Sequence, residues 1–243
     1  MRDWQQEVLK RVEFIREYLV EARADGIVFG NSGGKDCALV GILSKMATDN
    51  VLGVIMPCSS KINYGSDRSD AVKLSEKFGI PYIEVDLTKA KEALAESMGK
   101  SFEVKRAAEI NIAPRLRMTA LYAVAQSKNY LVAGTGNASE RYMGYFTKWG
   151  DGAFDFDAIA DLTATEIFEF LRYLGAPESI IEKAPSAGLF EGQTDEKEMG
   201  VSYREIDKYI MSGEASPEAK AVIDRFHLHT EHKRRLPRCY GID

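Results

Sequence analysis

The chain has 243 residues, of which 45% are hydrophobic and 28% charged, and this composition excludes a chain that is mainly disordered. Its formal net charge of −5 argues against a general nucleic-acid binder, and no apolar run is long enough to cross a membrane or to act as a signal peptide. Three scattered cysteines give neither a disulfide framework nor a paired zinc motif, so we expect a cytoplasmic protein.

The first hundred residues alternate between helical and strand patterns. Residues 4–22 carry apolar side chains at helical spacing, among them Val8, Val12 and Ile15. Short apolar runs bounded by turn residues then predict buried strands. In chain order we expect a strand at 26–30, a helix at 36–46, a strand at 51–56, a helix at 67–78, a strand at 81–85 and a helix at 88–99. This alternation predicts a parallel sheet with right-handed crossovers.

The second half of the chain continues the pattern and ends in helices. We expect a helix at 111–128, a strand at 130–133, a loop at 144–160 and helices at 163–174, 202–212 and 217–229. The fold class is therefore α/β, a Rossmann-like, doubly wound and mainly parallel sheet, with a helical C-terminal portion and tail from about residue 200 to 243. We expect a single domain over 1–243.

A glycine-rich turn between the first strand and the next helix is the strongest local motif. It runs over Gly30, Asn31, Ser32, Gly33, Gly34, Lys35, Asp36 and Cys37. Glycines let backbone N–H groups converge on an anion at the start of a helix, where the helix dipole also favours negative charge. A carboxylate such as Asp36 is understandable there if magnesium lies between it and phosphates. The alternative is an ordinary glycine turn that caps a helix.

This turn lacks the spacing of the common P-loop and resembles the SGGxDS pyrophosphate loop of the N-type ATP pyrophosphatases, which have the adenine nucleotide alpha hydrolase-like fold. It departs from that loop at Cys37, where the family usually has serine. A thiol at a helix N-terminus should have a lowered pKa, although we favour a tolerated small residue over a redox role.

Later segments narrow the resemblance to the ammonia-dependent NAD synthetases. The segments that match, in the order of that family, are 134–140 (GTGNASE), 144–152 (GYFTKWGDG), 185–189 (PSAGL), 192–196 (GQTDE), 198–200 (EMG) with Tyr203 and 206–207 (ID), and 230–234 (TEHKR). The resemblance runs from about residue 4 to 238 and is weakest over 59–68.

The resemblance implies amidation of nicotinic acid adenine dinucleotide (deamido-NAD) by free ammonia. ATP would activate the substrate carboxylate as an acyl-adenylate with loss of pyrophosphate, and ammonia would then release NAD and AMP. Two alternatives remain open. One is another ATP pyrophosphatase, such as a tRNA-modifying enzyme, and the other is a nucleotide-binding homologue that is catalytically impaired.

The resemblance also implies a role for particular residues. Asp36 and Glu140 would hold two magnesium ions that offset charge on the triphosphate, and with Lys148 they form the expected catalytic set. The turn 30–37, Thr135 and Ser186 would bind ATP. Arg115, Lys148, Asp155, His232 and Lys233 would bind the dinucleotide.

A second departure is Ala164, which stands where relatives have a lysine near the ATP phosphates; Lys35 or Lys183 are the candidates to replace that charge. The resemblance implies a homodimer with the helices at 4–22 or 111–128 at the interface. It implies no glutaminase domain within the chain.

Overall fold

The computed structural model describes residues 2–59, 63–183 and 194–241. Its centre is a four-stranded sheet in the order β3-β2-β1-β4, and every pair of neighbouring strands is parallel. The strands are β1 (Gly26–Gly30), β2 (Val51–Ile55), β3 (Tyr82–Glu84) and β4 (Tyr130–Val132). All four expected strands and their parallel pairing are therefore confirmed.

The strand order creates a topological switch point. From β1 the chain moves outward to β2 and β3, and it then returns to place β4 on the other side of β1. In open α/β sheets, ligands bind where the loops at the carboxyl ends of two such strands diverge. The loops after Gly30 and Val132 meet this condition.

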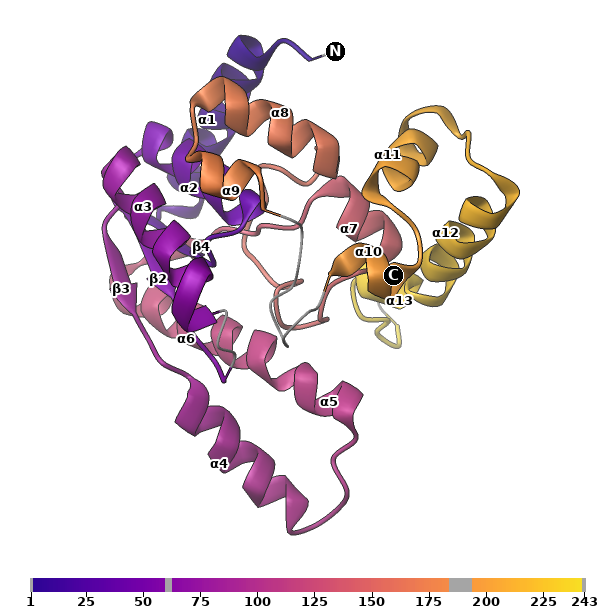
Figure 1. Cartoon of the computed structure of the whole chain (residues 1–243). Helices are drawn as coiled ribbons and strands as arrows, with labels where there is room; N and C mark the ends of the chain where they lie inside the picture. Colours follow the sequence, from indigo (N-terminus) through magenta and orange to yellow (C-terminus); the bar gives the residue numbers. More distant parts are fainter. Residues whose placement is uncertain (1, 60–62, 184–193, 242–243) are drawn as a thin grey trace.

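Helices cover both faces of the sheet, as the doubly wound pattern requires (Figure 1). α1 (Trp4–Ala22), α2 (Lys35–Ala47) and α8 (Ala164–Leu174) pack on the face to which Ile27 and Phe29 point. α6 (Ile112–Lys128) packs on the opposite face, against Val28 and Val132. Successive β1 side chains thus belong to two different cores, because side chains alternate across a strand.

The remaining helices surround the sheet and its carboxyl edge. They are η1 (Asn63–Asp67, an irregular helical turn), α3 (Arg68–Phe78), α4 (Thr88–Gly99), α5 (Arg106–Ile110), α7 (Ala138–Met143), α9 (Glu178–Ile181), α10 (Asp195–Met199), α11 (Tyr203–Ser212), α12 (Pro217–His229) and α13 (Glu231–Arg234). The long helices agree with the sequence prediction. The short helices α5, α7, α9, α10 and α13 were not expected, because four to six residues are too few to show a helical period.

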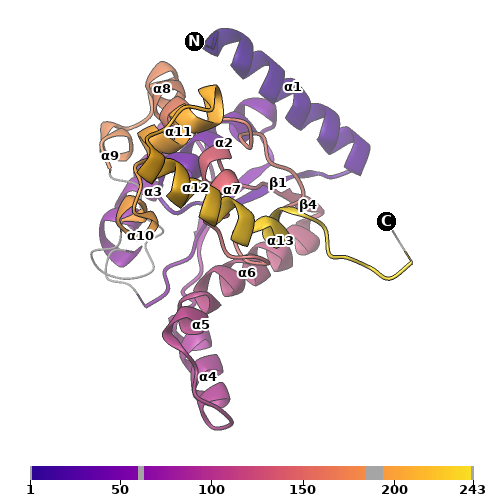
Figure 2. The same cartoon turned by 90° about the vertical axis from the view of Figure 1, so that its right-hand side faces the viewer.

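Two parts of the chain stand apart from the sheet. α4 and α5 project away from the body in both views (Figures 1 and 2). α11 and α12 pack with α7 around a third apolar cluster that includes Met143, Ile206 and Ile223. No helix of the described residues is long and apolar enough to cross a membrane.

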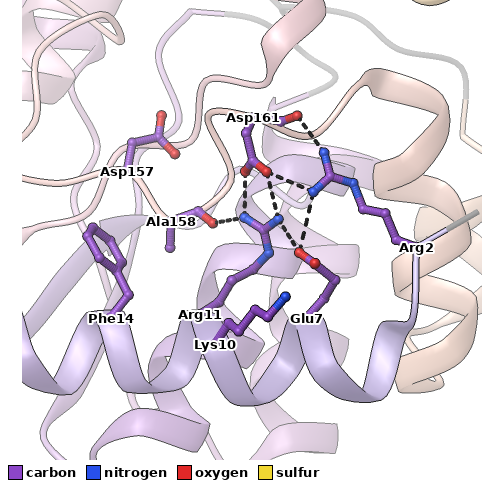
Figure 3. A pocket seen from close by; sticks show the side chains of 8 residues that line it. All are labelled: Arg2, Glu7, Lys10, Arg11, Phe14, Asp157, Ala158 and Asp161. Atoms are coloured by element: carbon purple, nitrogen blue, oxygen red, sulfur yellow. Dashed lines mark hydrogen bonds and ion pairs between the residues drawn. The ribbon is translucent and has the colours of Figure 1, made fainter. Parts of the chain in front are cut away.

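An ion-pair network fastens α1 to the loop before α8 (Figure 3). Arg11, which is 8% exposed, donates to the Asp161 carboxylate at 2.7 Å, to the Ala158 carbonyl at 2.5 Å and to Glu7 at 2.6 Å. Arg2 adds a bond of 2.9 Å to Asp161. The network holds the segment between α7 and α8. This segment follows the second glycine-rich loop, residues 134–137 after β4, and so supports the carboxyl edge of the sheet.

Candidate active site

The first glycine-rich turn leaves β1 at the switch point and enters α2 directly. Gly33 has φ +73°, which favours glycine, and a Cβ built there would lie 2.2 Å from the backbone oxygen of Asp67. Only a residue without a side chain fits between this turn and the start of α3. The turn therefore presents backbone N–H groups at the N-terminus of a 13-residue helix, as an anion site requires.

Buried hydrogen bonds hold the turn in this shape. Asn31 is 1% exposed, and its amide donates to the Ala71 carbonyl and to the Ser75 hydroxyl, both at 3.1 Å. The Ser32 hydroxyl accepts from the Gly34 N–H at 3.2 Å. The two sides of the turn are thus tied to α3 and to the start of α2.

The Cys37 thiol is half-buried at the start of α2 and contacts both loops. The Ser32 hydroxyl donates to Cys37 Sγ at 3.1 Å, and Thr135 from the second loop also hydrogen-bonds the thiol. Burial raises the pKa of Cys37, with the bonds to Ser32 and Thr135 opposing it in part. The expectation of a lowered pKa is therefore wrong, because desolvation of the thiolate outweighs the helix N-terminus.

The second loop follows β4 and brings Glu140 toward the first loop. Asn137 caps α7: its side chain accepts from the Glu140 N–H at 3.0 Å, and Glu140 accepts in return from the Asn137 N–H at 3.3 Å. The same Asn137 amide donates to Asp36 Oδ1 at 3.0 Å. One buried asparagine thus links both carboxylates that the sequence singled out.

Lys35 lies among these carboxylates. Its side chain is 6% exposed, and its ammonium is 2.5 Å from Asp36 Oδ2. Burial by itself lowers the pKa of Lys35, but Asp36, Glu140 and Asp195 more than offset this, so the pKa is raised. Lys35 is therefore a charged ammonium in an acidic, buried setting.

The pKa of Glu140 reflects its burial and the charged neighbours of this centre. Burial and the neighbouring Asp36 raise its pKa well above the usual range, although Lys35 partly offsets them. Among the residues described, no group of three or more His, Cys, Asp or Glu is placed to hold a metal alone. A divalent ion here would need further ligands from a phosphate substrate, which is how magnesium commonly binds.

A second cluster of expected residues gathers around the loop after α7. Arg115 on α6 donates to the Lys148 carbonyl at 3.3 Å, and the Lys148 ammonium donates to the His232 carbonyl at 2.7 Å. Lys233 donates to the carbonyls of Gly144 and Phe146 at 2.8 and 2.7 Å. The structure thus brings together Arg115, Lys148, His232 and Lys233, although 33 residues separate the first two and 84 separate Lys148 from His232.

Backbone geometry holds this cationic cluster in place. Trp149, next to Lys148, has φ +64°, a conformation uncommon for a non-glycine residue, and the Lys148 ammonium lies over its ring at 5.4 Å. A Cβ at Gly144 would meet the Thr230 hydroxyl at 2.1 Å, so the end of α12 packs directly on the end of α7. Burial also lowers the pKa of Lys233.

Other expected residues lie apart from both groups or outside the description. Both carboxylate oxygens of Asp155 are engaged, with the Tyr122 hydroxyl at 3.1 Å and the Val132 N–H at 2.7 Å. Lys183 pairs with Asp67 at 2.6 Å, whereas Ala164 is buried at the start of α8. Ser186 lies outside the described residues.

Sequence reasoning missed several residues that shape the centre. Asn137 was quoted only as part of a motif, yet Asn137 and Glu140 have the N-x-x-E spacing of a capping box, which would have placed a helix there. Tyr203 donates to Asp195 at 2.9 Å from α11, and no local pattern signals that contact. Arg117, for which the sequence left open an ATP contact or a structural role, is half-buried and donates to the Met56 carbonyl directly after β2 at 3.1 Å.

Comparison with known proteins gives consistent results. A family model described as NAD synthase matches residues 7–240. The NH(3)-dependent NAD(+) synthetase of Carboxydothermus hydrogenoformans is 48% identical over 97% of both chains. A structure of NMN synthetase from Francisella tularensis superposes with a TM-score of 0.94 and 37% identity over all of both chains. NH3-dependent NAD synthetase from Campylobacter jejuni gives 0.80 and 30%, over 98% of this chain and 99% of that one.

Proposed function

The chain belongs to the NAD synthase family, and on this premise we propose that it is an ATP-dependent ligase that amidates deamido-NAD with free ammonia to give NAD. The observation that carries the proposal is the meeting of the glycine-rich turn with Asp36 and Glu140 at the switch point of the sheet. That arrangement suits a nucleoside triphosphate cleaved at its α-phosphate.

In the first step, the pyridine carboxylate of the substrate attacks the α-phosphate of ATP. A bond forms between carboxylate oxygen and phosphorus, the bond to the β-phosphate bridge oxygen breaks, and pyrophosphate leaves. We assign the glycine-rich turn at the N-terminus of α2 to the departing pyrophosphate, because a helix N-terminus favours negative charge. Because no covalent enzyme intermediate is required, positioning and electrostatics supply the catalysis.

We assign magnesium to Asp36 and Glu140. The residues present fit a divalent cation, because two carboxylates are held near each other by Asn137 and burial keeps the pKa of Glu140 raised. A bound cation would favour ionised Glu140 and would offset charge on the phosphates. The backbone of the turn and Thr135 then hold the nucleotide, and we assign Ser186 to the same site.

In the second step, ammonia attacks the activated carbonyl, the carbonyl–oxygen bond to AMP breaks, and the surplus proton leaves to solvent. We assign Arg115, Lys148, His232 and Lys233 to the dinucleotide. Its phosphates need cations, which Arg115, Lys148 and Lys233 can supply, and hydrogen bonds to backbone carbonyls hold the four residues in one region. Asp155 remains a candidate for the same substrate, although its carboxylate is engaged with Tyr122.

A coupled assay tests the proposal. Purified protein with ATP, magnesium, deamido-NAD and millimolar ammonium should release NAD, AMP and pyrophosphate in equal amounts. Glutamine in place of ammonium should give little product. No NAD at millimolar ammonium would contradict the proposal.

A second candidate substrate is the corresponding mononucleotide acid, because the structure that superposes at a TM-score of 0.94 is named an NMN synthetase. The chemistry at the carboxylate would be the same. The two acids should be offered together at equal concentration, and the products separated. A preference for the mononucleotide in kcat/KM would select this candidate over deamido-NAD.

We further propose a homodimer in the cytoplasm. Leu9, Phe14 and Val20 on α1 are 58%, 43% and 79% exposed, which leaves apolar surface available for a subunit contact. The three free cysteines are compatible with a reducing compartment. Light scattering after size exclusion should give twice the chain mass, and Val20→Lys should shift it toward the monomer if α1 is the contact.

A further inference from the structure

Lys35 is the buried cation of the carboxylate centre, and its surroundings are specific. Its ammonium is 2.5 Å from Asp36 and lies 5.6 Å from the ring centre of Tyr203 and 5.8 Å from that of Phe168. Two aromatic faces, from α11 and α8, therefore flank the charge. Such faces attract a desolvated cation and limit the positions that the side chain can take.

The negative charge around Lys35 exceeds what one ammonium balances. Asp36 touches it, and Glu140 and Asp195 both act on it electrostatically. Asp195 is itself 4% exposed and accepts from the Tyr203 hydroxyl. A buried group with more carboxylates than cations favours uptake of a further positive charge, and a divalent ion that arrives with ATP supplies it.

We propose that the Lys35 ammonium is a built-in cation of this centre, which fills the role of a second divalent ion, so that Asp36 and Glu140 share one magnesium per site. The inference rests on the proposed reaction for its biological meaning, but it concerns metal binding by the chain itself. Lys35 engages Asp36 Oδ2 and the amide of Asn137 engages Oδ1, so a magnesium ion on Asp36 would use a remaining lone pair of one of these oxygens.

The alternative is that Lys35 binds a phosphate oxygen directly, as a lysine of a phosphate loop often does. The two roles predict different effects of the Lys35 charge on metal binding and on ATP binding. A built-in cation weakens metal binding to the empty protein, because like charges repel at short range. A phosphate ligand chiefly strengthens ATP binding, and its removal would raise the KM for ATP at every magnesium concentration.

The test measures Mn²⁺ binding to the intact protein without nucleotide, by electron paramagnetic resonance of the free ion. Lys35→Met and Lys35→Gln both remove the charge, and each should bind Mn²⁺ at least tenfold more tightly than the natural chain. Lys45→Met is the matched control, because Lys45 lies on the same helix and pairs with the exposed Asp49 at 2.6 Å. This control should leave Mn²⁺ binding unchanged.

Two further readouts complete the test. With α,β-methylene-ATP, the natural chain should hold one Mn²⁺ per site, a measurement that needs no variant. Activity of Lys35→Met should recover with rising magnesium. Two ions in the natural chain, unchanged or weaker Mn²⁺ binding in both variants, or a loss that magnesium does not restore would each overturn the proposal. The binding results are independent of which acid the enzyme amidates, so a failure here is distinct from a failure of the proposed reaction.

Discussion

Gly33→Ala tests whether the phosphate turn depends on its close approach to α3. Gly33 combines φ +73° with a Cβ position only 2.2 Å from the Asp67 oxygen and 3.1 Å from the Ala71 nitrogen. Gly79, at the end of α3, has a similar φ of +63°, but nothing lies within 4 Å of its Cβ position. The two substitutions therefore share the backbone strain and differ in the clash.

The difference in the free energy of unfolding follows from these distances. Left-handed φ costs alanine about 1–2 kcal/mol, less a few tenths regained from the stiffer unfolded chain. Gly79→Ala should therefore destabilise by about 1 kcal/mol. Gly33→Ala adds a clash with backbone atoms that cannot rotate away, worth about 1–3 kcal/mol. We expect a total loss of about 2–4 kcal/mol.

Thermal unfolding and ATP titration measure both consequences. For a chain of this length, 1 kcal/mol corresponds to about 2–4 °C in Tm. The Tm of Gly33→Ala should therefore fall by roughly 4–16 °C, and that of Gly79→Ala by roughly 2–4 °C. Relief of the clash must move the turn, so ATP binding should weaken at least tenfold in Gly33→Ala alone. Equal Tm values for the two variants, with ATP binding intact, would refute the reasoning.

Three other predictions concern titrating groups. Glu140→Gln should abolish AMP formation and weaken Mn²⁺ binding without lowering Tm, because it removes a carboxylate whose pKa burial raises; retained activity would contradict the metal assignment. Burial raises the pKa of Cys37, so a short iodoacetamide pulse near pH 8 should label the exposed Cys239 first, and equal labelling of the two thiols would contradict this. The variant Cys37→Ser should keep its activity within about threefold. Burial raises the pKa of Asp157 from its usual 3.8 to about 6, so the cost of ionising it in the folded chain grows between about pH 4 and 6 and is constant above that range. Asp157→Asn should therefore stabilise by about 1–3 kcal/mol at pH 8, and by roughly half as much near pH 5; a gain independent of pH would exclude this cause.

The architecture was predictable because its signals are local. Each buried strand is an apolar run beside a turn, and the long helices show a full apolar period, as the buried Ala38, Leu39, Ile42 and Leu43 in α2 illustrate. The parallel pairing then follows from the alternation of elements. Even the meeting of Asp36 and Glu140 is implied, since both follow strands whose carboxyl ends share one edge.

The chemistry of the centre was not predictable, because it depends on distant packing. The dipole argument for Cys37 omitted the desolvation of the thiol by burial in the folded chain, which raises its pKa although the bonds to Ser32 and Thr135 lower it. From the sequence, Lys35 was one of two candidates, with Lys183, to supply the charge that Ala164 lacks. The acidic and aromatic surroundings of Lys35 exist only in the folded chain, because α10 and α11 bring Asp195 and Tyr203 close to it from some 160 residues away.

α7 connects the two groups of residues on which the proposed reaction depends. Glu140 lies in its first turn, and the loop that carries Lys148 begins directly after its last residue, Met143. Glu140 and Gly144 are four residues apart, which is about 6 Å along a helix, so a spacer of roughly that length separates the carboxylate centre from the loop that carries Lys148. α7 is held at one end by the capping bonds of Asn137 and at the other by the close packing of Gly144 on Thr230. An acidic chain can therefore bind two anionic substrates, because short, fixed elements place its few cations where the charges meet, and its net charge of −5 says little about that local field.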